Sequence, residues 1–233
     1  MHKIDDQLAK VTARIHQAAA AAGRNPQTVQ LIAVSKTQAA QALVDAYAWG
    51  QRAFGENYLQ EALEKQQQLA HLPDIEWHFI GPIQSNKTRP IAEHFAWVHS
   101  VDRLKIAQRL HEQRPAALPP LNICVQVNID DETTKSGVSL AELPQLVSAI
   151  APLDRLSLRG LMAIPAATND AQQQRAAFAK LRVALEQLNQ QGYQLDCLSM
   201  GMSGDMEAAI AEGATFVRVG TDIFGARAKP AAL

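Results

Sequence analysis

Eight short apolar runs, separated by amphipathic stretches, follow one another along almost the whole chain. The runs cover residues 30–36, 53–57, 76–81, 97–101, 122–129, 158–164, 197–201 and 216–220. Between them apolar side chains recur at helical spacing, as at Phe178, Leu181 and Leu185. Strands that alternate with helices in this way predict a parallel sheet covered by helices. A doubly wound open sheet has the same local pattern, so the alternation alone leaves two architectures open.

Two further features favour a closed (β/α)8 barrel. The strand count is eight, and nearly every run ends in a polar residue, namely Lys36, Asn57, His78, Ser100, Asn128, Ser199 and Arg218. Barrel enzymes carry their chemistry at the carboxyl ends of the strands. A helix over residues 2–22 precedes the first run, and no linker interrupts the chain. We therefore predict a single domain over residues 1–233, a TIM barrel of the α/β class with an extra N-terminal helix.

The composition excludes several functional classes. The net charge is -1, with acids and bases interspersed, which argues against a nucleic-acid partner or a membrane surface. No stretch approaches the ~18 apolar residues of a membrane span, and the N-terminus is too polar for a signal peptide. Cys124 and Cys197 lie inside apolar runs and are expected to be buried free thiols. No metal-ligand spacing is present. These features predict a cytoplasmic protein without a metal.

Lys36 is the first candidate for chemistry. At strand spacing it shares a face with Ile32 and Val34, so an inward-facing run would aim its ammonium into the barrel. Desolvation there would lower the pKa of the amine and make it competent to form a Schiff base. A lysine at the rim that merely reaches solvent remains the alternative.

An anion site is expected where the last two runs end. Gly201 and Gly204 allow close approach of the backbone in the segment Ser199-Met-Gly-Met-Ser-Gly-Asp205, and Ser203 is expected to cap a helix over residues 204–212. Arg218 and Gly220, in Arg218-Val-Gly-Thr221, fall on the interior face of the last run. A buried guanidinium without an anion is costly, and this part of a barrel often binds phosphate.

Three more residues are candidate ligand contacts. Asn57 and His78 end the second and third runs, where either side chain can hydrogen-bond a ligand. A histidine on a strand is more often a satisfied core residue. Met162 is expected to point inward and to pack under a flat ring, although filling the core is the usual role of methionine.

These segments, in this order, resemble the pyridoxal phosphate homeostasis protein family over nearly the whole chain. The resemblance rests on Ala33-Val-Ser-Lys-Thr37, Phe54-Gly-Glu-Asn-Tyr58, Trp77-His-Phe-Ile-Gly-Pro-Ile-Gln-Ser-Asn-Lys87, Leu198-Ser-Met-Gly-Met-Ser203 and Val217-Arg-Val-Gly-Thr221. It implies a barrel similar to that of alanine racemase, of the kind called PLP fold type III. It also implies pyridoxal 5'-phosphate (PLP) bound covalently to Nζ of Lys36 as an internal aldimine. The residues implied to surround its phosphate and ring are Ser199, Gly201, Arg218, Gly220 and Thr221.

The resemblance implies a binding protein rather than an enzyme, one that stores PLP and releases it to PLP-dependent apoenzymes. A PLP-dependent amino-acid racemase is the alternative, and it needs a base on each face of the bound substrate. Of the three tyrosines only Tyr58 is expected near the rim. A lysine-dependent aldolase or phosphosugar enzyme on the same barrel is a third interpretation. We expect a monomer, and whether Arg218 contacts the phosphate or the ring nitrogen stays open.

Overall fold

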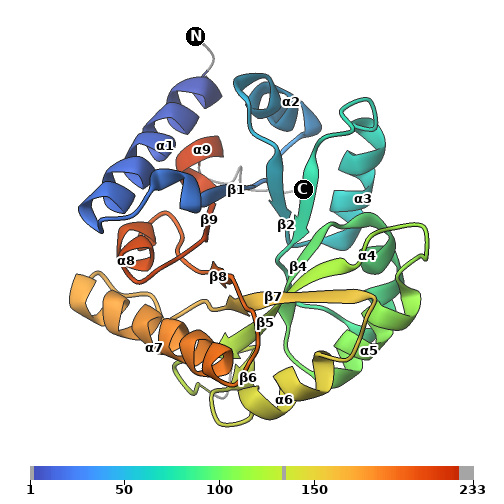
Figure 1. The fold of residues 1–233 in the computed structure, drawn as a ribbon. Helices are drawn as coiled ribbons and strands as arrows, with labels where there is room; N and C mark the ends of the chain where they lie inside the picture. Colours follow the sequence, from blue (N-terminus) through green and yellow to red (C-terminus); the bar gives the residue numbers. More distant parts are fainter. Residues whose placement is uncertain (1–2, 133–134, 226–233) are drawn as a thin grey trace.

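The computed structural model describes residues 3–132 and 135–225, and in this part of the chain eight parallel strands close into a barrel (Figure 1). The order around the barrel is β4-β3-β2-β1-β9-β8-β7-β5, and pairing between β4 and β5 closes the ring. The strands are β1 (Gln30–Val34), β2 (Ala53–Glu56), β3 (Glu76–Phe79), β4 (Trp97–Val101), β5 (Leu121–Asn128), β7 (Leu156–Met162), β8 (Cys197–Ser199) and β9 (Phe216–Val219). Closure confirms the predicted (β/α)8 barrel and excludes the doubly wound sheet. A single domain over residues 1–233 stays a prediction.

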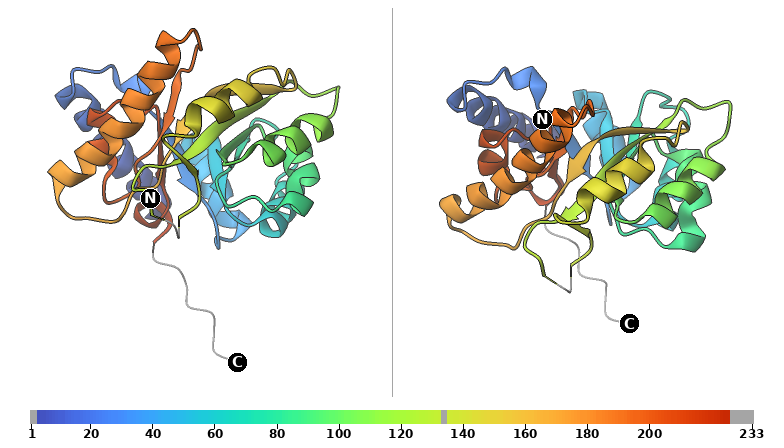
Figure 2. Two further views of the ribbon diagram at one scale, coloured as in Figure 1. Left: turned by 90° about the horizontal axis from the view of Figure 1, so that it is seen from below. Right: turned by 60° about the horizontal axis from the view of Figure 1, so that its bottom comes forward.

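The helices form a ring outside the barrel, which the two views of Figure 2 show from other directions. They are α1 (Lys3–Ala21), α2 (Ala40–Trp49), α3 (Leu59–Gln68), α4 (Thr88–His94), α5 (Leu104–Gln113), α6 (Leu143–Ile150), α7 (Ala171–Gln190), α8 (Met206–Ala211) and α9 (Thr221–Phe224). The N-terminal α1 packs against α2, α8 and α9, and so fills the ring beside the last strand. Among the described residues, no helix is long and apolar enough to cross a membrane.

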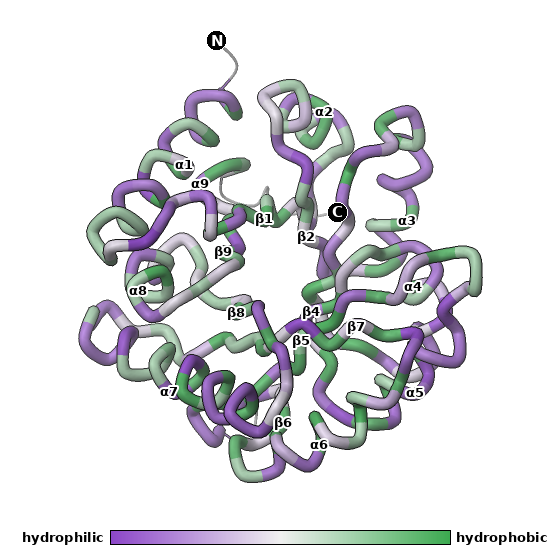
Figure 3. Tube along the Cα trace, in the orientation of Figure 1, coloured by the Kyte–Doolittle hydropathy of each residue, from purple (hydrophilic) through white to green (hydrophobic). Residues whose placement is uncertain are grey.

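The apolar core has two layers because side chains on a strand alternate between the two faces of the sheet. The inner layer fills the barrel with Ile32, Ala53, Trp97, Cys124, Met162, Cys197 and Phe216. The outer layer lies between the sheet and the helices and includes Ala33 and Phe54. Figure 3 shows hydrophilic and hydrophobic residues alternating along the helices, as expected when one helix face covers the sheet. Ile32 and Met162 therefore point inward, as the sequence predicts.

The first strand is shorter than predicted. β1 ends at Val34, and Lys36 lies in the turn that follows instead of in the strand. The next residue, Thr37, has a φ of 64°, a left-handed conformation that is rare for a β-branched residue. Lys36 thus projects from a tight turn at the carboxyl end of the barrel.

The starts of two helices depend on residues in the turns before them. Ser139 and Glu142 hydrogen-bond each other in a turn before α6, which starts at Leu143 with Pro144 in its first turn. Proline is tolerated there because the first N–H groups of a helix have no partner within it. The expected cap at Ser203 is wrong. α8 begins at Met206, and the Asp205 carboxylate instead accepts a hydrogen bond from the Met202 N–H at 2.6 Å.

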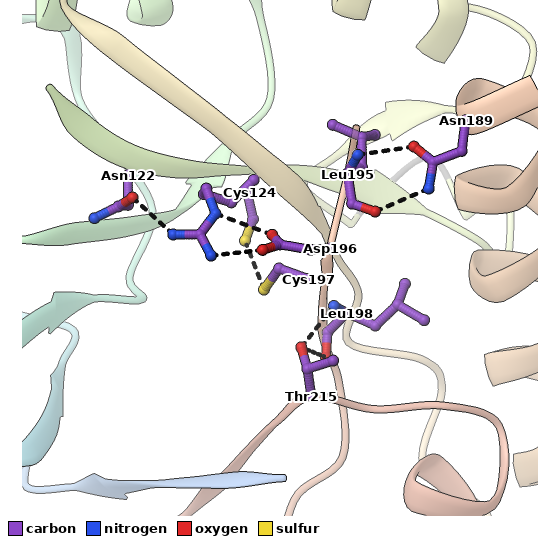
Figure 4. Close-up of polar contacts among 9 residues, drawn as sticks. Asn122, Cys124, Asn189, Leu195, Asp196, Cys197, Leu198 and Thr215 are labelled. Carbon is purple, nitrogen blue, oxygen red and sulfur yellow. Dashed lines mark hydrogen bonds and ion pairs between the residues drawn. The ribbon is translucent and has the colours of Figure 1, made fainter. Parts of the chain in front are cut away.

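The two cysteines meet inside the barrel near the amino ends of the strands (Figure 4). Their sulfur atoms lie 3.6 Å apart, and both are free and buried, as predicted. Arg159 crosses the same end of the barrel. Its guanidinium lies 5.0 Å from the centre of the Trp97 ring and pairs with Asp196 at 2.7 Å. An ion pair and an aromatic ring therefore cover the thiols at this end.

Candidate functional site

The carboxyl ends of β1 and β9 bring the lysine turn and the last predicted loop together. The two strands pair with Ile32 opposite Arg218. Two residues further along both strands, a Cβ atom on Gly220 would lie 3.0 Å from the Val34 carbonyl oxygen. Because Lys36 comes two residues after Val34, the turn that carries Lys36 lies beside Gly220 and Thr221. Thr221 is exposed at the start of α9, and Lys36 is half-buried.

The loop between β8 and α8 requires glycine at Gly201. This residue has a φ of 95°, and a Cβ atom would lie only 2.6 Å from that of Ala209. Its carbonyl oxygen accepts a hydrogen bond from the Arg218 N–H at 2.9 Å, which ties the loop to β9. The two segments predicted to form an anion site are therefore in direct contact.

Arg218 is a buried cation with neutral hydrogen-bond partners. Its side chain donates to Ser199 Oγ at 2.8 Å and to the carbonyl oxygen of Ala163 at 3.1 Å, and the residue is 4% exposed. Burial lowers the pKa of the guanidinium to about 10, while Asp205 opposes the shift. Arg218 therefore stays protonated at neutral pH and carries its charge into the barrel. The interior position expected for Arg218 is confirmed.

Behind Arg218 a line of hydrogen bonds crosses the barrel interior, and we call it the Glu76–Arg218 relay. From Ser199 it passes to His99 Nδ1 at 2.8 Å, from His99 Nε2 to His78 Nδ1 at 2.9 Å, and from His78 Nε2 to Glu76 Oε1 at 2.9 Å. Ser199 and both histidines are fully buried. The relay therefore links residues from β3, β4, β8 and β9.

The relay has one consistent set of proton positions. The hydrogen bond from His78 lowers the pKa of Glu76, so this end is a carboxylate and His78 Nε2 carries the donated proton. Burial lowers the pKa of both histidines and keeps them neutral at neutral pH, so each Nδ1 is an acceptor. It follows that His99 Nε2–H donates to His78 and that the Ser199 hydroxyl donates to His99. The Ser199 oxygen then accepts from Arg218.

The other three predicted contacts lie at two different depths. Met162 and His78 lie in the buried interior, beneath the rim, and both ring nitrogens of His78 have partners. Asn57 is at the rim, beside a cavity of about 240 Å³ that Gln126, Lys135 and Ser136 also line. Among the described residues its buried Oδ1 has no hydrogen-bond partner. Buried acceptors normally have one, so this oxygen is a candidate contact for a ligand.

Sequence reasoning missed His99 and Glu76. On β4 it selected Ser100, whose hydroxyl donates outside the relay to the Gly81 carbonyl oxygen at 2.5 Å. Strand alternation would have found His99, because Trp97 and His99 share the inward face. Glu76 starts its strand, so a search of carboxyl ends could not reach it. Within residues 3–132 and 135–225, no cluster of histidine, cysteine or acidic residues has the arrangement of a metal site.

Comparison with known proteins identifies the family. The family described as alanine racemase, N-terminal domain, matches residues 7–228. A Pseudomonas aeruginosa protein named pyridoxal phosphate homeostasis protein is 64% identical, over 97% of each chain. An Escherichia coli K12 protein of the same name is 53% identical, over 97% of this chain and 98% of its own. The chain belongs to the pyridoxal phosphate homeostasis protein family.

Solved structures agree with this family assignment. The structure of PipY from Synechococcus elongatus PCC7942 with PLP bound is 41% identical, with a TM-score of 0.84 over 95% of this chain and 100% of that one. Alanine racemase from Corynebacterium glutamicum is 18% identical, with a TM-score of 0.70 over 95% of this chain and 62% of that one. At that identity the likeness shows the shared barrel alone.

Proposed function

We propose that this chain binds pyridoxal 5'-phosphate at the carboxyl end of the barrel and serves PLP homeostasis, storing the cofactor and releasing it. The observation that carries the proposal is the pairing of β1 with β9. This pairing brings the turn that carries Lys36 beside Gly220, at the carboxyl end of the strand that carries the buried Arg218. The name of the 64% identical relative and the PLP in PipY support the same ligand.

We call the carboxyl end of the barrel its mouth, and the residues there fit the chemistry of this cofactor. Gly201 and Gly220 allow the two loops to pack closely, against Ala209 and Val34, at the end of the barrel where we place the phosphate. The side chain of Arg218 donates to a hydroxyl and a carbonyl oxygen, so its positive charge is not paired with a carboxylate by these hydrogen bonds. The buried Oδ1 of Asn57 has no hydrogen-bond partner among the described residues. We assign Ser199 and Thr221 to the same contact set, with Met162 and His78 forming its floor.

The covalent anchor is assigned to Lys36. The chemistry that bound PLP would supply is that of an aldehyde, with which the Lys36 amine could form a Schiff base with loss of one water. The chain's own task is to hold that amine at the mouth, to bind the phosphate and ring, and to keep Arg218 in place through Ser199. Exchange with another amine would free the cofactor for PLP-dependent apoenzymes in transient contact.

We further propose that the chain is not an enzyme. Racemisation needs a second base. Tyr47 hydrogen-bonds Asp74 beneath the Arg52 guanidinium, and Tyr193 packs on the outer core layer. Tyr58, 52% exposed beside Asn57, is the tyrosine left for the racemase alternative.

We also propose a location and an oligomeric state. The two free thiols suit the reducing conditions of the cytoplasm, and we propose that the protein is a monomer there.

The visible spectrum of the protein tests this proposal. PLP added to the purified protein should give the yellow absorption of a lysine-bound cofactor, and borohydride should fix it on the peptide that contains Lys36. Lys36→Ala should remove the colour and leave the fold intact, while the exposed Lys10→Ala serves as the matched control. Colour that persists in Lys36→Ala would remove Lys36 from its role. Absence of bound PLP in the wild-type protein would refute the function.

A further inference from the structure

A buried lysine lies behind the turn that carries Lys36. Lys65, on α3, is 4% exposed, and its Nζ donates to the Ser35 carbonyl oxygen at 2.6 Å. It also donates to Glu56 Oε1 at 2.8 Å and to Glu61 Oε1 at 2.5 Å. Three acceptors therefore satisfy all three protons of this ammonium.

These contacts reach both peptide groups that flank Lys36. The Ser35 carbonyl belongs to the peptide group before Lys36, and it is held by Lys65 directly. The Thr37 N–H belongs to the peptide group after Lys36, and it donates to Glu61 Oε1 at 2.6 Å. Because both flanking groups are fixed, the two backbone dihedrals of Lys36 are fixed, and so is the direction of its Cα–Cβ bond.

Glu56 joins the cluster to the sheet. This residue ends β2 and is fully buried, and its Oε1 accepts from Ser35 Oγ at 2.6 Å and from Lys65. Burial raises the pKa of Glu56, and the attraction of Lys65 opposes the shift. The Lys36 turn is thus attached to β2 and α3 by direct hydrogen bonds to Glu56 and Glu61, and the Lys65 ammonium joins both carboxylates to the Ser35 carbonyl oxygen.

Stability alone does not account for this arrangement. A buried ion pair is often no more stabilising than apolar residues of the same volume, so it is weak evidence for a purely structural role. The cluster also holds Thr37 at a φ of 64°, a conformation that a β-branched residue adopts rarely without support. What these contacts specify is the path of the backbone on either side of one residue.

We propose that Lys65 is a positioning residue that, with Glu61 as its second arm, holds the Lys36 turn so that the Lys36 amine faces the mouth of the barrel. The proposal rests on the proposed function in one respect, the assignment of Lys36 as the anchor. Lys65 acts through the backbone and does not contact the cofactor.

The test uses two variants that loosen the turn to different degrees. Glu61→Ala removes the acceptor of the Thr37 N–H and leaves the bonds of Lys65 to Ser35 and Glu56. Lys65→Met removes the donor to the Ser35 carbonyl oxygen and leaves the buried Glu56 carboxylate without its cation, while Glu61 can still accept from the Thr37 N–H. Glu64→Ala is the matched control because it removes the same charge from an exposed position on the same helix, where Glu64 accepts a hydrogen bond from Gln60.

Two measurements separate positioning from stability. In the cofactor-free protein, competitive acetylation with acetic anhydride over a pH series gives the reactivity and apparent pKa of the Lys36 amine. With PLP added, borohydride trapping followed by peptide mass spectrometry gives the rate of attachment at Lys36. Thermal unfolding of each variant is recorded beside them.

We expect Lys65→Met to slow attachment at Lys36 on the order of tenfold or more, since misplacement by about 1 Å costs up to about a hundredfold. Glu61→Ala should give a smaller slowing and a changed acetylation profile at an unfolding temperature close to that of Glu64→Ala. Equal acetylation profiles and attachment rates in Glu61→Ala and Glu64→Ala would overturn the positioning role. Lack of attachment at Lys36 in the wild-type protein would instead overturn the proposed function, and this inference with it.

Discussion

Ser199 Oγ lies 2.8 Å from His99 Nδ1 and 2.8 Å from Arg218 Nη1. One hydroxyl therefore joins the buried cation to a histidine that lies deeper in the barrel. Because a hydroxyl has a single proton, the proton that Ser199 gives to His99 fixes the lone pairs that it offers to Arg218. The orientation of Arg218 thus depends on residues that do not reach the mouth.

Replacement of His99 by leucine should weaken PLP retention. The change leaves the proton of the Ser199 hydroxyl without an acceptor and His78 Nδ1 without a donor in a buried site, so the orientation in which Ser199 accepts from Arg218 is no longer fixed. Such unsatisfied groups cost about 1–3 kcal/mol of folding stability, and a rearrangement of Ser199 and Arg218 that relieves them should lower PLP affinity by up to roughly 150-fold. Equilibrium titration of the cofactor-free protein with PLP measures the change.

The control for this variant is His94→Leu at the exposed end of α4. That substitution should leave PLP affinity unchanged. If His99→Leu binds PLP as tightly as His94→Leu, the relay does not orient Arg218.

Stability should fall on acidification below pH 6.5 because of the same histidines. Burial lowers the pKa of His78, and the pKa of His99 lies well below its usual 6.5. Between the folded and unfolded pKa values the unfolded chain binds more protons, so the stabilisation is present above pH 6.5 and is lost as the pH falls. For each histidine, the free energy of unfolding should fall by up to about 1.4 kcal/mol for each pH unit of acidification in this range. Urea unfolding of the cofactor-free protein at pH 7.5, 6.5 and 5.5 measures this slope, and His99→Leu should reduce it. If the slope is the same in the wild-type protein and in His99→Leu, the lowered pKa of His99 does not contribute to the pH dependence of stability.

Gly201→Ala should destabilise the loop of the proposed phosphate site by about 2–4 kcal/mol. The added methyl group would meet Ala209 at 2.6 Å, and alanine also disfavours a φ of 95°. Gly213→Ala separates these causes, because Gly213 has a φ of 99° and no atom within 3.5 Å of the added Cβ. In Gly213→Ala the free energy of unfolding should fall by only about 1 kcal/mol, and the affinity for PLP should not change. Denaturant unfolding and PLP titration of both variants provide the comparison, and equal losses would show that the contact with Ala209 is not decisive.

The sequence predicts the fold well because the barrel depends on repeated local patterns. Each of the eight apolar runs becomes a strand, and Trp97–Val101 matches its predicted range at both ends. The errors concern the ends of elements. A tight turn at Thr37 stops β1 at Val34, and α8 begins at Met206, after a turn in which the Asp205 carboxylate accepts from the Met202 N–H. Such ends are decided by single side-chain contacts, which periodicity does not encode.

The candidate site is predicted less completely, and the omissions share one cause. Lys36, Ser199, Arg218 and the glycines near them follow from the rule that chemistry gathers at the carboxyl ends of barrel strands. Glu76 and Lys65 lie at the start of a strand and on a helix, and they act on site residues through other groups. Contacts between residues on separate elements become visible only once the register of the strands is known. The roles of the predicted contacts stay predictions.

Arg218→Lys should weaken PLP binding even though it keeps the charge. A lysine ammonium cannot reproduce the planar fork that donates to Ser199 Oγ and to the Ala163 carbonyl oxygen together. We expect the free energy of PLP binding to become less favourable by about 1–3 kcal/mol, as for a lost charge-assisted hydrogen bond. PLP titration at low and at moderate salt measures it, with the exposed Arg89→Lys on α4 as the control. Wild-type affinity in Arg218→Lys would show that the fork geometry is unimportant and that charge alone suffices.

The native protein should resist thiol reagents at both cysteines. Cys124 and Cys197 are buried inside the barrel, and burial raises the pKa of the Cys124 thiol well above its usual value. The thiolate is the reactive form, so little of it is present at neutral pH. The amino-terminal end of the barrel is covered beside them by Arg159, which pairs with Asp196 and lies over Trp97. Labelling with a disulfide reagent should therefore proceed at the rate of unfolding, and Asp196→Asn, which loosens the cover, should accelerate it. Rapid labelling of the wild-type protein in native buffer would mean that this end of the barrel opens without unfolding.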